Sequence, residues 1–145
     1  MKNRIISAVL LLNSFLCLSQ QEVTWDDLAK VTFTEKFFVL YDDYFLYPKF
    51  SPFIKSLEGK QIALSGYFLS VDPESKMYIL SKGPMSSCFF CGQGGPETAV
   101  ELVFPQKPNF KTDDIIMVTG TLKLNKDDVE HFNYIMTDCK AKLIQ

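Results

Sequence analysis

The sequence predicts a mainly β protein, a small closed or partly open barrel of five to seven strands with one or two short helices. Several segments alternate apolar and polar residues with a period of two, as half-buried strands do. The two clearest segments each carry a mid-strand glycine, Gly66 and Gly120, where strands bend or bulge. The thirteen Phe and six Tyr residues also favour pleated, packed surfaces.

Short helices and one strand are expected before residue 60. Thr24 is an N-cap candidate for a helix over residues 24–29, because acidic residues follow it in the first turn. Residues 31–34 alternate as a strand, and the aromatic runs that follow lie on both sides of a turn at Asp42 and Asp43. Residues 50–57 predict one helical turn, with Ser51 as its cap and Pro52 at its first position.

The rest of the chain predicts strands separated by turns. The segments with strand character are 61–71, 77–80, 99–104, 115–124 and 132–137. Residues 105–114, with their prolines and polar side chains, predict a loop. A glycine-kinked strand, a hairpin and a later Val-Thr-Gly-Thr-Leu strand are together similar to the OB-fold, a five-stranded Greek-key barrel. An open β-sandwich of the same strands is the alternative.

Residues 1–19 have the features of a signal peptide. Lys2 and Arg4 precede an apolar stretch over residues 5–18, and Ser19 is a small residue before a cleavage point. The stretch is shorter than the roughly 18 residues of a membrane-spanning helix, although an uncleaved anchor is an alternative. We therefore expect export to the periplasm or the extracellular space, with residues 20–145 as a single OB-like domain.

Neither a lipid-modified cysteine nor a later apolar segment is expected to anchor the protein in a membrane. Leu16 precedes Cys17, whereas lipoprotein signals resemble one another in having Gly, Ala or Ser there, so lipid modification of Cys17 is disfavoured. No later segment is apolar enough to span a bilayer.

Without Lys2 and Arg4 the formal charge falls from −2 to about −4, which argues against nucleic-acid binding. The expected partners are a protein, a metal ion or a glycan.

The sequence Cys88-Phe-Phe-Cys91, followed by Gly-Gln-Gly-Gly-Pro, is the one compact group of chemically active residues. With Cys139, the exported segment has three cysteines, and a structural disulfide between any two of them suits an oxidising compartment. Phe89 and Phe90 are candidates for contacts with a partner or for packing. The glycine-rich segment does not predict a phosphate site, because it lacks the Lys-Ser/Thr pair that should follow.

A metal site is the second interpretation of this pair, since Cys-x-x-Cys supplies half of a tetrahedral zinc site. His131 and Cys139 are the remaining candidates for the other half. Copper(I) needs fewer ligands, and Met85 could supply a third sulfur atom. Thiol–disulfide chemistry is a further alternative, but a reactive thiol usually lies at a helix N-terminus, and the glycines and proline after Cys91 oppose a helix.

A family resemblance accompanies these motifs. The order Trp25-Asp-Asp-Leu, Leu57-Glu-Gly-Lys, Gly66-Tyr and Ser-Cys88-Phe-Phe-Cys91-Gly resembles exported bacterial proteins of domain of unknown function 3299, and more closely a group common in Bacteroidetes. The resemblance covers most of residues 20–145. It implies an OB-like barrel and an envelope location. A link to metal handling in some members of the wider family mildly favours a metal site here.

These observations lead to one functional expectation. The acidic pairs lie at turns or helix starts, and no Ser/His/Asp arrangement is present, so solvated turns explain them better than acid–base catalysis. We expect an exported, non-enzymatic binding or assembly module with a Cys-x-x-Cys loop, bridged or bound to zinc or copper. An envelope thiol–disulfide redox protein is the alternative.

Overall fold

The computed structural model describes residues 20–72, 74 and 76–145. The predicted signal peptide and Cys17 lie outside these residues. The helical elements are α2 (Trp25–Leu28), α3 (Pro52–Leu57) and three 3₁₀ turns, η2 (Met85–Ser87), η3 (Phe89–Cys91) and η4 (Pro96–Thr98). The strands are β1 (Gln21–Glu22), β2 (Val31–Phe38), β3 (Asp43–Phe50), β4 (Gln61–Asp72), β5 (Met77–Ser81), β6 (Ala99–Leu102), β7 (Ile115–Leu124) and β8 (Tyr134–Leu143).

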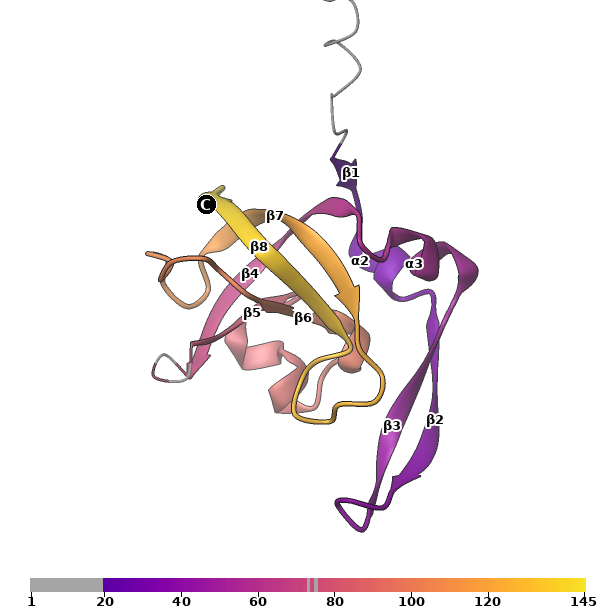
Figure 1. The fold of residues 1–145 in the computed structure, drawn as a ribbon. Coiled ribbons are helices and arrows are strands. Elements are labelled where there is room, and N and C mark those ends of the chain that lie inside the picture. Colours follow the sequence, from indigo (N-terminus) through magenta and orange to yellow (C-terminus); the bar gives the residue numbers. More distant parts are fainter. Residues whose placement is uncertain (1–19, 73, 75) are drawn as a thin grey trace, which may run out of the picture.

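Five of these strands close into a barrel, as the sequence predicted (Figure 1). Their order is β4-β5-β6-β8-β7, and β7 pairs back onto β4. The neighbours are antiparallel except β6 and β8, which run parallel, and β1 adds a short parallel pairing to β4. This is the connectivity of a small OB-like barrel, and the closure of the sheet excludes the open sandwich.

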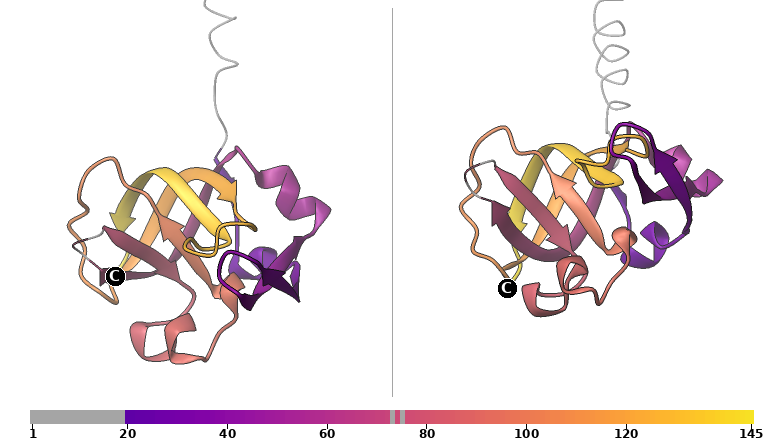
Figure 2. Two further views of the ribbon diagram at one scale, coloured as in Figure 1. Left: turned by 60° about the horizontal axis from the view of Figure 1, so that its bottom comes forward. Right: turned by 90° about the horizontal axis from the view of Figure 1, so that it is seen from below.

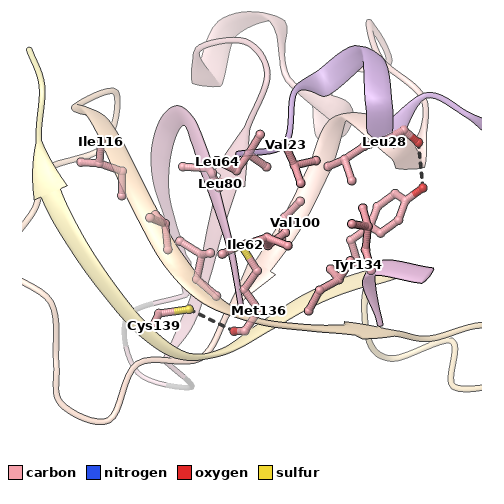
Figure 3. Packing of buried hydrophobic residues seen from close by; sticks show 14 of the residues in the cluster. Val23, Leu28, Ile62, Leu64, Leu80, Val100, Ile116, Tyr134, Met136 and Cys139 are labelled. Carbon is pink, nitrogen blue, oxygen red and sulfur yellow. Dashed lines mark hydrogen bonds between the residues drawn. The ribbon is translucent and has the colours of Figure 1, made fainter. Parts of the chain in front are cut away.

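The barrel interior is filled by the inward-facing residues of alternating strand positions. Ile116, Val118, Gly120 and Leu122 of β7 are buried, as its sequence pattern predicted, while Met117, Thr119 and Thr121 between them are only partly buried and face outward. Helices α2 and α3 add apolar side chains to the same core. Figure 3 shows this packing and the Tyr134 hydroxyl, which donates a 2.7 Å hydrogen bond to the carbonyl oxygen of Leu28. A buried hydrogen bond thus joins β8 to α2.

The two mid-strand glycines are needed for different reasons. At Gly120 a Cβ would lie 2.8 Å from the carbonyl oxygen of Thr137, and the pairing with β8 shifts register there. The predicted bulge is therefore present at Gly120. At Gly66 the pairing of β4 with β7 runs without a shift. A Cβ at Gly66 would instead lie 2.6 Å from the carbonyl oxygen of Ser81 and 2.9 Å from the Trp25 ring, so close packing requires this glycine.

The N-caps of both helices are those that the sequence predicted. Thr24 and Asp27 form a capping box, in which each side chain accepts a hydrogen bond from the backbone N–H of the other residue. The Ser51 hydroxyl accepts from the Ile54 backbone N–H, and Pro52 occupies the first helical position. Helix α3 buries Ile54 and Leu57 against the barrel.

Strands β2 and β3 form a separate two-stranded sheet, here called the hairpin, which extends away from the barrel (Figures 1 and 2). Its first strand continues past the predicted residues 31–34 to Phe38, because the aromatic residues after Thr34 pair with β3 across their whole length. Aromatic pairs across the two strands stabilise this arrangement. The tip is exposed, with Val39 and Leu40 83% and 95% accessible to solvent.

The last strand is also longer than predicted, and this corrects the position of Cys139. The sequence placed the strand over residues 132–137, with Cys139 just beyond it. In the structure β8 runs from Tyr134 to Leu143. Its pairing with β7 is irregular opposite Gly120, where Asp138 is left-handed (φ 54°), and the regular pairing resumes after this irregularity beyond Thr137. Cys139 therefore lies within the strand and faces the barrel interior.

In the part of the chain that the structure describes, no helix combines the length and the apolar character that crossing a bilayer requires.

Two buried tyrosines of the core provide a matched test of the packing. We expect Tyr134→Phe to lower the free energy of unfolding by about 1 to 3 kcal/mol, because the buried Leu28 carbonyl loses its donor. The Tyr78 hydroxyl is buried without a hydrogen-bond partner among the described residues, so Tyr78→Phe should be neutral or slightly stabilising. Urea unfolding of the two variants measures the difference, and equal losses would contradict this description of the core.

Candidate binding site around the cysteine turn

Residues 84–92, here called the cysteine turn, place Cys88 and Cys91 on one compact segment. The 3₁₀ turns η2 and η3 meet at Cys88, whose backbone is extended. The Cys91 N–H donates a 3.0 Å hydrogen bond to the Cys88 carbonyl oxygen. Gly92 then adopts a left-handed conformation (φ 72°) and ends η3, so no α-helix follows the pair.

The cysteine turn packs on the outer face of the barrel, where it covers strands β4, β5 and β6 (Figure 2). Cys88 is buried there against Leu69, Ile79 and Ala99, one residue from each strand. These three alternate along their strands with residues of the barrel core, so they point to the opposite side of the sheet wall. Burial of this apolar patch holds the turn in place.

Three sulfur atoms come together in the cysteine turn. The Sγ atom of Cys88 lies 4.0 Å from the Sδ atom of Met85. The Cys91 thiol donates a 3.0 Å hydrogen bond to the Met85 carbonyl oxygen. Partial desolvation, together with a hydrogen bond shared with the Cys88 thiol, raises the pKa of Cys91. All three cysteines of the described chain are free thiols, with Cys91 exposed and Cys88 and Cys139 buried.

Cys139 lies apart from this group. It belongs to the barrel core, where its thiol donates a 3.1 Å hydrogen bond to the Met136 carbonyl oxygen (Figure 3). Burial raises the pKa of Cys139 to about 12. Because Cys88 packs on the outer face of the same sheet, the barrel wall separates the two sulfur atoms. The structure thus does not bring together Cys139 and the other two cysteines.

His131 lies in the loop between β7 and β8 (residues 125–133), where a carboxylate orients its ring. Its Nδ1 atom is 2.9 and 3.0 Å from the two carboxylate oxygens of Glu101, and one of these, Oε2, also accepts the backbone N–H of Phe132. The Glu101 side chain is only 12% exposed. In the neutral tautomer that carries its proton on Nδ1, the ring donates to Glu101 and its Nε2 atom can accept a hydrogen bond. Within the described residues, no three or more His, Cys, Asp or Glu side chains gather as metal ligands.

Aromatic contacts join the cysteine turn to the β7–β8 loop. Phe132 lies against Phe89 and Phe90 with ring centroids 6.0 and 5.9 Å apart, in edge-to-face arrangements. Phe89 and Phe90 contact each other at 5.7 Å. Phe89 is half-buried, whereas Phe90 is 50% exposed. One of the two predicted contact residues therefore packs, and the other is open to a partner.

A cavity of about 410 Å³ opens between the hairpin, the cysteine turn and the β7–β8 loop, and is here called the cleft. Aromatic rings lie on both of its sides, from the hairpin and from the segment around the cysteines. Polar side chains of the loop complete it. The lining residues are Phe38, Tyr44, Phe45, Leu46, Phe89, Pro96, Lys126, Asp128, Val129, Glu130, His131, Phe132 and Asn133.

One ion pair connects the hairpin to the opposite side of the cleft. Lys36 Nζ lies 3.1 Å from an Asp127 carboxylate oxygen and 4.0 Å above the Tyr47 ring. Its hydrogen bond with Asp127 raises the pKa of Lys36 and lowers that of Asp127. At the hairpin tip, burial and the nearby carboxylates of Glu130 and Asp128 raise the pKa of Tyr41. These contacts set the hairpin across from the loop.

The sequence did not identify the cleft or Glu101 as functional. The signal in the sequence is the density of aromatic residues between 37 and 50, which by itself indicates only strand packing. Glu101 lies on β6, thirty residues before His131, so the pair becomes visible only once the strand order is known. Met85, by contrast, is a candidate from the sequence because copper(I) favours sulfur ligands, and its Sδ atom lies 4.0 Å from Cys88 Sγ.

No protein-family model, no curated protein and no solved structure matches this chain. The resemblance to domain of unknown function 3299 therefore stays a prediction.

The thiols should differ sharply in reactivity. We expect a small alkylating reagent to modify Cys91 first in the native protein, since Cys88 and Cys139 are buried. Because the pKa of Cys91 is raised, its thiolate fraction at neutral pH is smaller than that of a free cysteine, and its labelling rate should keep increasing at higher pH. Mass spectrometry across a pH series measures this, and rapid labelling of Cys91 below pH 7 would contradict it.

Proposed function

We propose that this protein is an exported, non-enzymatic binding module that takes a glycan into the cleft. The observation that carries the proposal is a cavity of about 410 Å³ lined by aromatic residues of the hairpin, the cysteine turn and the β7–β8 loop, together with hydrogen-bonding side chains of that loop. Small-molecule sites are typically concave and mostly apolar, with a few polar groups that fix orientation. The exported location is the one predicted from residues 1–19.

The composition of the cleft favours a glycan over other ligands. Phe38 and Phe45 face the cleft from the hairpin, and Phe89 and Phe132 from the other side, so the apolar faces of a sugar ring can pack between them. The β7–β8 loop adds exposed acceptors that a ligand can use, namely the carboxylate oxygens of Asp128 and Glu130. Sugar hydroxyls donate to such acceptors.

Two other ligand classes fit the cleft less well. An apolar peptide segment could use the aromatic rings but would offer no donors to these carboxylates. A nucleic acid would place phosphates beside Asp128 and Glu130, and Lys126, the one lysine among the described lining residues, offsets only part of their repulsion. An uncharged oligosaccharide meets neither obstacle.

In this function the cysteine turn supports one side of the cleft, since it carries Phe89. The two states predicted from the sequence are compatible with this role, since a Cys88–Cys91 disulfide or a bound zinc or copper ion would each stiffen the turn itself. The redox alternative is less well supported, because the raised pKa of Cys91 disfavours the thiolate that attacks disulfides.

The glycan proposal predicts that ring contacts in the cleft control affinity. A glycan array with the purified exported protein identifies the best oligosaccharide, and calorimetry measures its affinity. Phe45→Leu keeps an apolar side chain but removes the ring, and should weaken binding about tenfold. Phe37→Leu is the matched control. Phe37 lies in the same hairpin, on the strand opposite Phe45, but does not line the cleft.

His131→Gln should also weaken binding, since the ring that Glu101 orients is lost. Circular dichroism establishes that each variant remains folded. An array without any bound glycan, or equal affinities for Phe45→Leu and Phe37→Leu, would contradict the proposal. Binding of peptides in place of glycans would assign the cleft to a protein partner.

A further inference from the structure

We propose that Met85, Cys88 and Cys91 bind one Cu(I) ion through their three sulfur atoms. The inference deepens, and rests on, the metal-bound state of the cysteine turn described under the proposed function. It does not depend on the glycan, because none of these three residues lines the cleft. The site is formed by a single segment of the chain on the outer face of the barrel.

The distance between two of the three sulfur atoms, those of Met85 and Cys88, matches a three-coordinate site. If three sulfur atoms surround a metal at about 2.3 Å, the length of a thiolate bond to a first-row metal such as zinc, trigonal planar geometry separates neighbouring sulfur atoms by about 4.0 Å. The Sδ atom of Met85 lies 4.0 Å from the Sγ atom of Cys88. The Cys91 thiol is hydrogen-bonded to the Met85 carbonyl oxygen and shares a hydrogen bond with Cys88. Its sulfur atom is the third ligand.

The donor set selects a soft cation. Thiolate and thioether sulfur are the ligands that favour Cu(I), whereas a structural zinc site needs four ligands drawn from cysteine, histidine and carboxylate. The two residues that could have completed a zinc shell do not join the cysteine pair. Cys139 lies inside the barrel, and within the described residues no three His, Cys, Asp or Glu side chains, His131 included, gather as metal ligands.

The surroundings of the three sulfur atoms suit a reversibly bound ion. Cys88 is 2% exposed and packs against Leu69 and Ile79, so one side of the site is apolar and closed to water. Cys91 is exposed and gives the ion a route in and out. Gly92 turns the chain away directly after Cys91 and leaves that route open.

Binding exchanges protons for metal and transfers no electron. The ion arrives as Cu(I), the thiols of Cys88 and Cys91 each release one proton to solvent, and the thioether of Met85 contributes only a lone pair. The resulting site carries one net negative charge. Because both thiols must lose a proton to bind the ion, affinity should increase as pH rises from 6 to 8.

The test is a Cu(I) titration of the reduced, purified protein without oxygen, in competition with bicinchoninate. We expect one Cu(I) per chain. Cys88→Ser and Cys91→Ser should each lower the affinity roughly a hundredfold, and Met85→Leu about tenfold. Cys139→Ser and Met77→Leu are the matched controls, and should bind like the natural protein because neither residue belongs to the cysteine turn.

Several results would overturn the proposal. These are absence of Cu(I) binding, unchanged binding in Cys91→Ser or Met85→Leu, and Zn²⁺ binding at the same stoichiometry with equal or higher affinity. A Cys88–Cys91 disulfide that persists in protein taken directly from the producing cells would also overturn it. Cys91 is exposed and Met85 only partly buried, so these variants remain informative if Cys88→Ser fails to fold. Glycan binding measured in parallel separates failure here from failure of the cleft.

Discussion

The structure depends on the double pairing of β4, the twelve-residue strand that closes the barrel. One edge of β4 pairs with β7, and the other pairs first with β1 and then with β5. Its inward residues, such as Leu64 and Phe68, fill the core, while Leu69 on the outer face supports the cysteine turn. A shift of β4 by one residue would turn its core residues outward and its outer residues inward. Pairing on both edges holds β4 in the one register that avoids this.

This constraint explains why the candidate site lies beside the barrel strands and not across them. In OB-folds the face of the second and third strands is a common binding surface. Here the corresponding strands, β5 and β6, carry Ile79 and Ala99 beneath Cys88, so the cysteine turn occupies that face. The open surface is displaced toward the β7–β8 loop, where Phe132 links the turn to the cleft.

The barrel could be predicted from the sequence because its strands alternate clearly, as Ile116 and Val118 show, and because Gly120 marks a bulge. The hairpin was only partly predictable, since Phe37 and Phe38 are consecutive and give no period of two. The inward position of Cys139 depends on the irregular pairing opposite Gly120. Partners such as Glu101 and His131 depend on the strand order, which local patterns do not contain.

The hairpin determines how rigid the cleft is before a ligand arrives. A two-stranded sheet is marginal by itself, and surface ion pairs such as Lys36–Asp127 contribute about 0 to 1 kcal/mol. The hairpin side of the cleft is therefore held weakly, whereas the side formed by Phe89 and Phe132 is anchored on the barrel. Ordering the hairpin on binding would cost conformational entropy and so lower the affinity of the cleft for its proposed ligand. Stiffening the hairpin should therefore raise that affinity without adding a contact.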